Sequence, residues 1–117
     1  MAETTLLVDF DIKPGKLNDF KAAAAALFAK TQSEPGTLRY EYFLSDDGTS
    51  NMNIEVFADA DAFVFHNRNV ADLVPALMEA VDKLSIAVIG DANDDLRAEL
   101  SDVETKHYDL LGGIDRD

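Results

Sequence analysis

Apolar and polar residues alternate in three stretches of this chain, which is the pattern of β-strands. Residues 4–12 carry an apolar side chain at every second position from Leu6 to Ile12, so one face of this segment is predicted to be buried. Residues 37–45 and 51–57 alternate as well, and the "DDGT" between them contains the Asp-Gly pair favoured in tight hairpins. The sequence therefore predicts an N-terminal strand and a later hairpin of two antiparallel strands.

Helical spacing of apolar residues follows the first strand. Over residues 16–31 apolar residues recur three or four positions apart, and "EPG" at 34–36 ends the predicted helix. After the hairpin, either Asp59 or Asp61 can cap a short helix. Each of these helices therefore directly follows a predicted strand.

The second half of the chain predicts two further helices and a strand between them. Asp72 is expected to cap a helix over residues 73–84. The apolar, branched run "SIAVIG" at 85–90 predicts a buried strand. Asn93 is expected to cap a third helix that extends to Val103.

The predicted order is strand, helix, strand, strand, helix, strand, followed by an added helix and a tail that is extended or a loop. This is the order of the ferredoxin-like split βαβ fold, an α+β fold. It implies a four-stranded antiparallel sheet with helices on one face. At 117 residues we expect a single domain, 1–117, with a core of about 4–91 and a C-terminal helix and tail over 92–117.

The face of the sheet opposite the helices is also expected to be apolar. Met52, Ile54 and Val56 form one apolar row of residues 51–57, and Phe57 and either Ile86 or Ala87 supply others, so the strands are expected to be apolar on both faces. An apolar sheet face needs a cover, and a second copy of the same domain is the simplest one. We therefore expect a homodimer.

Composition excludes several classes of function. The formal charge of −13 repels phosphate backbones and anionic lipids, so nucleic-acid and membrane binding are not expected. The chain has no cysteine, which rules out disulfides, thiolate nucleophiles and cysteine-based metal sites. The N-terminal segment has neither a basic region nor an unbroken apolar run, so a signal peptide is not expected and a cytoplasmic location follows by default.

The predicted hairpin brings four polar residues together. With a two- or four-residue connection around Asp47 and Gly48, the numbers of opposed residues add up to 95. That register pairs Tyr42 with Asn53, Tyr40 with Glu55 and Leu38 with Phe57. Directly opposed side chains lie about 4.5–5.5 Å apart at Cβ. Two phenols, an amide and a carboxylate are therefore expected to form one cluster beneath the helices.

This cluster has two interpretations that the residues alone leave open. In the first it is structural, with Tyr42 bonded to Asn53 and Tyr40 to Glu55. In the second it lines a pocket in which the amide and phenols orient a ligand, and Glu55, its pKa raised by burial, accepts a proton.

The segments "EPGTLRYEYF", "DDGT" and "EVFADADAFVFH" resemble the antibiotic biosynthesis monooxygenase domain, a family of dimeric α/β barrels. The resemblance covers about Leu6 to Gly90. Members that oxidise phenols or quinols use no metal or organic cofactor, and let the substrate anion reduce dioxygen directly. The resemblance thus implies an oxygenase without a cofactor.

Several residues match positions of that family. Tyr42 and Asn53 match a pocket tyrosine and asparagine, and His66 matches the histidine of the short helix. Phe57 stands where such members carry a tryptophan, and Ala71 where a second histidine often occurs. The related haem-degrading branch needs that tryptophan and an asparagine on the first strand, so haem degradation is not expected.

The candidate catalytic residues are His66, Asn53 and Glu55, with His66 the natural general base near neutral pH. Substrate binding is assigned to Tyr40, Tyr42, Phe57, Phe63 and Arg68, the last with Asn69 closing the pocket over an anionic group. His107 and Tyr108 lie in the tail, which is expected to cover the pocket or reach a partner. No metal site is expected, because the histidines lack a helical two-histidine spacing.

Three functions remain open. The first is a cofactor-independent monooxygenase that oxidises a small phenol or quinol with dioxygen. The second is an isomerase or lyase that moves protons on a small oxygenated metabolite. The third is a non-catalytic dimeric ligand-binding or stress-response barrel, which would follow if no pocket lay between Tyr42, Asn53 and His66.

Overall fold

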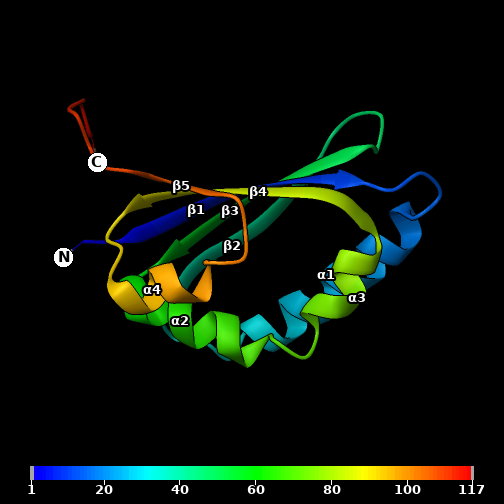
Figure 1. Ribbon diagram of the computed structural model, residues 1–117, viewed down its shortest axis with the longest axis horizontal. Coiled ribbons are helices and arrows are strands. Elements are labelled where there is room, and N and C mark those ends of the chain that lie inside the picture. Colours follow the sequence, from blue (N-terminus) through cyan, green and yellow to red (C-terminus); the bar gives the residue numbers. More distant parts are fainter. Residues whose placement is uncertain (1, 117) are drawn as a thin grey trace.

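The computed structural model, which describes residues 2–116, places the helices on one side of a five-stranded sheet (Figure 1). The elements are β1 (Thr4–Ile12), α1 (Leu17–Thr31), β2 (Thr37–Leu44), β3 (Ser50–Phe57), α2 (Ala60–Asn69), α3 (Val74–Glu79), β4 (Val81–Gly90), α4 (Asp94–Glu99) and β5 (Thr105–Tyr108). The strand order is β2-β3-β1-β4-β5. The α+β class and the ferredoxin-like order of the first four strands are confirmed.

The predicted four-stranded antiparallel sheet is wrong in one respect, because β5 adds a fifth strand. This strand runs parallel to β4 and pairs Thr105 with Ile86 and Tyr108 with Ile89. The other neighbouring strands are antiparallel. A stretch of four residues is too short for alternation to reveal it, and the pairing depends on α4 carrying the chain back along the sheet.

The predicted helix over residues 73–84 is also wrong, since α3 ends at Glu79 and β4 starts at Val81. The cause is tertiary: the central strand β1 extends to Ile12, which pairs with Val81. Sheet pairing thus overrides the helical spacing of the same apolar residues. Asp72 does not cap α3, and instead accepts a hydrogen bond from Lys30.

Two of the predicted helix caps are confirmed. The side chain of Asp59 accepts a hydrogen bond from the Ala62 amide at the start of α2. Asn93 does the same for the Leu96 amide at the start of α4. Helix α4 is shorter than predicted, because it ends at Glu99 rather than Val103.

The hairpin has the register that the sequence predicts. Tyr42 lies opposite Asn53 and Tyr40 opposite Glu55. The amide of Ser45 bonds to the carbonyl of Ser50 at 2.9 Å, which leaves a four-residue connection. Only the predicted pairing of Leu38 with Phe57 is wrong, because Phe57 lies opposite Thr37. The strand register shifts between Thr37 and Arg39, and this shift leaves Leu38 exposed.

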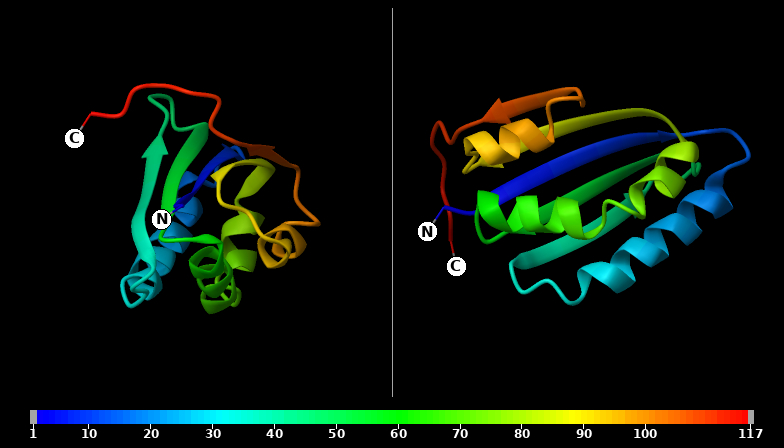
Figure 2. Two further views of the ribbon diagram at one scale, coloured as in Figure 1. Left: turned by 90° about the vertical axis from the view of Figure 1, so that its left-hand side faces the viewer. Right: turned by 60° about the horizontal axis from the view of Figure 1, so that its bottom comes forward.

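The two faces of the sheet differ, as Figure 2 shows: the helices cover one face, and the other carries none. The core lies under the helices and includes Leu6, Val8 and Phe10 of β1. Phe57 and Ile86 also lie on this covered side. The exposed large apolar residues of the strands include Phe43, Met52 and Ile89. No helix within residues 2–116 has the length and apolar character needed to span a bilayer.

Candidate functional site

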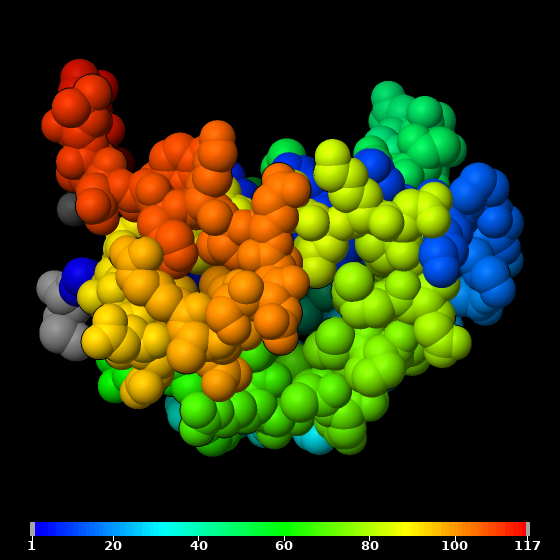
Figure 3. Space-filling view, viewed as in Figure 1, coloured from blue at the N-terminus to red at the C-terminus, as the bar shows by residue number. Residues whose placement is uncertain are grey.

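A cavity of about 110 Å³ lies between the sheet and the helices. Its polar lining comes from Tyr40, Tyr42, Asn53, Glu55, His66 and Asn67. The apolar wall includes Leu6, Val8, Phe10, Leu27, Phe63, Val70, Val74, Leu77, Met78, Leu84, Ile86 and Leu100. Figure 3 shows a hollow between the orange segment after α4 and the yellow-green segment of α3 and β4. Tyr42, Asn53 and His66 therefore line one cavity.

Strand β3 supplies a row of polar side chains to the site. Asn51, Asn53 and Glu55 alternate along the strand, so all three point toward the helices and are buried. Nδ2 of Asn53 donates a hydrogen bond to Oε2 of Glu55 at 2.9 Å. The amide of Asn51 lies 2.7 Å from Oδ1 of Asn53. The row thus fixes the orientation of Asn53 and one oxygen of Glu55.

Strand β2 adds the two tyrosines, whose hydroxyl oxygens lie 2.9 Å apart. The ring of Phe28 packs edge-on against that of Tyr42, with centroids 5.0 Å apart. Burial raises the pKa of both phenols, and the neighbouring charge of Glu55 raises them further. Both hydroxyls therefore keep their protons and can donate hydrogen bonds.

Glu55 is almost fully buried, and its burial raises the pKa of the carboxyl to about 7. The hydrogen bond from Asn53 lowers this pKa in part, and the charge of Glu34 raises it. The carboxyl can therefore exist in both protonation states near neutral pH, as an acid–base catalyst requires.

His66 projects from α2 beside the tyrosines, with its ring centroid 4.9 Å from that of Tyr40. Its Nδ1 lies 2.8 Å from Oε1 of Glu34, and both side chains are at most 5% exposed. Burial lowers the pKa of His66, although the Glu34 carboxylate opposes that effect. The imidazole is therefore neutral at neutral pH.

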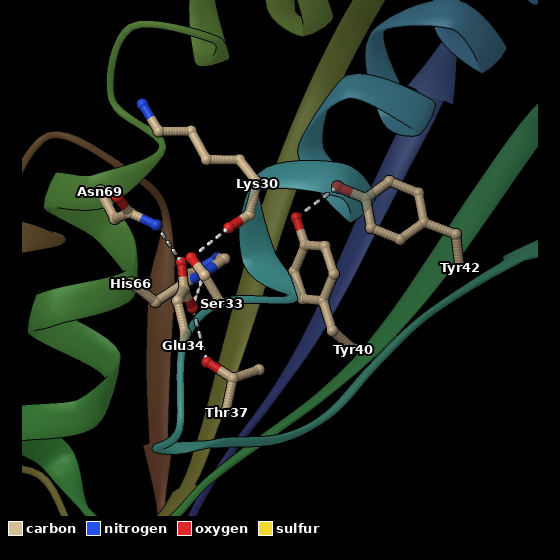
Figure 4. A network of polar contacts seen from close by, with 8 residues as sticks. All are labelled: Lys30, Ser33, Glu34, Thr37, Tyr40, Tyr42, His66 and Asn69. Carbon is tan, nitrogen blue, oxygen red and sulfur yellow. Dashed lines mark hydrogen bonds and ion pairs between the residues drawn. The ribbon is translucent and has the colours of Figure 1, made fainter.

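Glu34 is a buried residue in contact with the site that the sequence reasoning missed. Its carboxylate accepts hydrogen bonds from His66, from the Thr37 hydroxyl at 2.6 Å and from the Asn69 amide at 2.8 Å (Figure 4). In the sequence it was interpreted only as the residue before Pro35 in a helix-ending turn. The available signal was its place as the first residue of the segment "EPGTLRYEYF", which resembles the family.

Most of the predicted site residues meet at the cavity. Those that line it are Tyr40, Tyr42, Asn53, Glu55, Phe63 and His66. Phe57 lies behind them, with its ring 5.3 Å from that of His66 and 5.4 Å from that of Phe63. Their chemical roles stay predictions.

Two sets of predicted residues lie elsewhere. Arg68 does not reach the cavity, contrary to the prediction, because its exposed side chain binds Glu99 of α4. Asn69 turns inward to Glu34 rather than closing the mouth. His107 and Tyr108 lie in the edge strand β5, exposed and outside the cavity lining. Within residues 2–116, no cluster of three or more His, Asp or Glu could hold a metal ion.

Solved structures with the same fold support a relationship to known proteins. The chain is 26% identical to MupZ from Pseudomonas fluorescens, with a TM-score of 0.79 over 97% of this chain and 94% of that one. It is 26% identical to SO0527 from Shewanella oneidensis, with a TM-score of 0.68 over 76% and 90% of the two chains. An antibiotic biosynthesis monooxygenase at 22% identity shares the fold, with a TM-score of 0.68 over 77% and 98%.

A comparison with curated protein sequences finds no match. The family model for antibiotic biosynthesis monooxygenases, in contrast, matches residues 4–80, which span β1 to the end of α3. This match contains the hairpin, the short helix of His66 and every polar residue that lines the cavity. The chain therefore belongs to the antibiotic biosynthesis monooxygenase family.

Proposed function

We propose that this protein is a cofactor-independent monooxygenase that oxidises a small phenol or quinol with dioxygen. Membership of the family supports this proposal. The observation that carries it is the meeting of a neutral histidine and a carboxyl of pKa about 7 at one largely apolar cavity. Pairs of groups whose surroundings move their pKa values in opposite directions mark acid and base roles.

The free atoms of both groups have access to this cavity. The only fully buried side-chain oxygen or nitrogen without a partner in residues 2–116 is Oγ1 of Thr31. Nε2 of His66 and Oε1 of Glu55 have no hydrogen-bond partner in this part of the chain, so both retain contact with accessible space. The space that both residues line is the cavity.

In the proposed reaction, Nε2 of His66 takes the phenolic proton and Tyr42 and Asn53 hold the resulting oxyanion. The anion reduces dioxygen, which adds to a ring carbon. The O–O bond then breaks, one oxygen stays on the ring as a second carbonyl, and the other leaves as water. That water carries the phenolic and ring hydrogens, and protonated Glu55 relays one of them.

The size of the cavity limits the substrate. An engineered cavity of about 150 Å³ holds one benzene molecule. At about 110 Å³ this cavity is smaller, so it admits at most a single ring, or the reacting ring of a longer molecule whose remainder extends through the mouth. A fused polycycle does not fit without movement of the wall.

Oxygen uptake with a panel of one-ring hydroquinones tests the proposal. We expect quinone formation with one atom of ¹⁸O from labelled dioxygen, and a rate reduced about 100-fold or more in Glu55→Gln. Glu79→Gln, which changes an exposed acid on α3, serves as the control and should keep the rate. Turnover that persists in Glu55→Gln would contradict the acid role, and no uptake across the panel would contradict the oxygenase.

A second function, an isomerase or lyase without dioxygen, is favoured by the phenol pair beside the carboxyl. Tyrosine and protonated carboxyl donors can hold an enolate oxygen while a neutral base moves the proton. Tyr40, Tyr42 and Glu55 provide such donors next to His66. Exchange of deuterium into α-protons of small cyclic ketones, with no oxygen uptake, would identify this reaction.

We also propose a homodimer that packs through the face of the sheet without helices. Phe43 and Met52 are 48% and 44% exposed there, and Ile89 is 39% exposed. A self-complementary apolar face of this kind favours a two-fold interface.

A further inference from the structure

We propose that the cavity accepts only uncharged ligands and rejects carboxylates and phosphates. The inference rests on the proposed use of this cavity as a small-molecule site. The ionisable side chains that line it are Tyr40, Tyr42, Glu55 and His66, and no lysine or arginine within residues 2–116 lines it. Near neutral pH the tyrosines and His66 are neutral. The only charge that the cavity lining carries among the described residues is therefore the negative charge of ionised Glu55.

Two cationic side chains, Arg68 of α2 and Lys30 of α1, are engaged on the surface. Arg68, which the sequence placed at the mouth, binds Glu99, and Lys30 binds Asp72. Behind His66 lies the buried Glu34, whose charge already raises the pKa of Glu55 and Tyr40. A second anion in the cavity would meet the same repulsion.

Desolvation makes this repulsion decisive. An ionised carboxylate that leaves water needs a paired charge or several hydrogen bonds, and an unpaired one is strongly disfavoured. The site offers donors, namely the phenols and the Asn53 amide, but these suit a hydroxyl or carbonyl oxygen. The ligand class is thus an uncharged ring that carries a hydroxyl or carbonyl group.

Matched pairs of hydroxybenzamides and hydroxybenzoates test this selection, because members of a pair have the same number of heavy atoms. At pH 8, titrations followed by NMR of the cavity residues should give a Kd at least tenfold lower for the amide. Equal or tighter binding of the benzoate would overturn the charge selection while leaving the proposed function intact. Failure of every compound to bind would overturn the small-molecule site itself.

Two variants locate the effect. Glu55→Gln removes the negative charge that lines the cavity, so the preference for the amide should shrink several-fold at pH 8. Glu79→Gln removes the same charge from the exposed surface of α3 and should leave the preference unchanged. An equal response of both variants would overturn the local origin of the selection and assign it to the net charge of the molecule.

The hydrogen bonds that Glu34 accepts support a second, independent inference. We infer that Glu34 is a positioning residue that fixes the tautomer of His66. Its two oxygens accept from Thr37, Asn69 and Nδ1 of His66. A carboxylate surrounded by donors requires the proton on Nδ1, which leaves the lone pair on Nε2 toward the cavity. Glu34 itself does not line the cavity.

The two histidines of the chain make this tautomer directly measurable. Long-range ¹H–¹⁵N spectra distinguish the two neutral forms, and the exposed His107 serves as an internal reference. The wild-type spectrum at pH 8 should show His66 protonated at Nδ1. A His66 protonated at Nε2 would overturn the inference without any variant and without any substrate.

Glu34→Gln adds a second test. The amide can donate to Nδ1, so the form protonated at Nε2 should rise to a major population. Thr37→Val removes one hydrogen bond to Glu34 but keeps the charge, and should preserve the wild-type tautomer. An unchanged His66 spectrum in folded Glu34→Gln would show a purely structural role.

Discussion

Glu55 gives the protein its most distinctive response to pH. The pKa of this carboxyl rises from its ordinary 4.5 to about 7 on folding. A raised pKa means that the unfolded chain loses the proton first, so stability falls as pH rises from about 4.5 to 7 and is constant above. At 1.36 kcal/mol per pH unit, the loss is on the order of 3 kcal/mol.

Glu55→Gln should remove this dependence. The variant keeps an oxygen that accepts from Asn53, so we expect it to be more stable than the wild type at pH 8, by roughly 2–3 kcal/mol, and nearly equal near pH 5. Urea unfolding at several pH values measures the difference. Glu79→Gln should show no such trend, and a flat difference in Glu55→Gln would contradict the raised pKa.

Asn53→Ala tests the hydrogen bond within the β3 row. That bond lowers the pKa of Glu55, so its loss should raise the pKa above about 7, as ¹³C NMR of the carboxyl carbon can measure. Turnover should fall, and stability should fall by about 1–3 kcal/mol because buried partners lose a hydrogen bond. Asn18→Ala, on the exposed side of α1, should leave the pKa unchanged.

The residues of the site and those around it divide according to the information that determines their positions. Alternation along two paired strands is sufficient to bring Tyr40, Tyr42, Asn53 and Glu55 together. Glu34 and Arg68 depend on how a turn and a helix end pack against other segments, which no local pattern encodes. The first contacts His66 of α2, and the second contacts Glu99 of α4.

At the scale of elements, strands with strong alternation were predicted to within a residue, and β1 has the predicted bounds. The boundary between α3 and β4 was predicted wrongly, because residues 81–84 suit both a helix and a strand. Pairing with β1 decides between them. The capping residues Asp59 and Asn93 acted locally and were predicted correctly.

Gly90 at the end of β4 should tolerate no side chain. Its φ of +93° is one that other residues rarely adopt, and a Cβ would lie 2.6 Å from the carbonyl oxygen of Glu3. Gly90→Ala should therefore destabilise the protein by about 2–4 kcal/mol in urea unfolding. Gly112→Ala, where a Cβ would meet no atom within 4 Å, should be neutral, and equal effects would contradict the close approach.

At the scale of the whole molecule, the proposed dimer makes its own prediction. Phe43→Lys places a charge on the sheet face without helices, so it should convert a dimer to a monomer in analytical ultracentrifugation. Phe65→Lys changes an even more exposed phenylalanine, at 58%, on α2 and should leave the dimer intact. A wild-type monomer would contradict the proposed interface.

The overall architecture followed from the order of elements, whereas the fifth strand did not. β5 is recognisable only once β4 presents a free edge for it. A segment so short carries no pattern of its own and is ordered by the sheet that it joins.

The tyrosine pair at the cavity has an optical consequence. The chain contains no tryptophan and three tyrosines, of which Tyr40 and Tyr42 line the cavity and Tyr108 lies on β5. Two of the three tyrosines that give the protein its intrinsic fluorescence therefore lie at its own site. A molecule that enters the cavity should alter this emission, so occupancy can be followed without an added label.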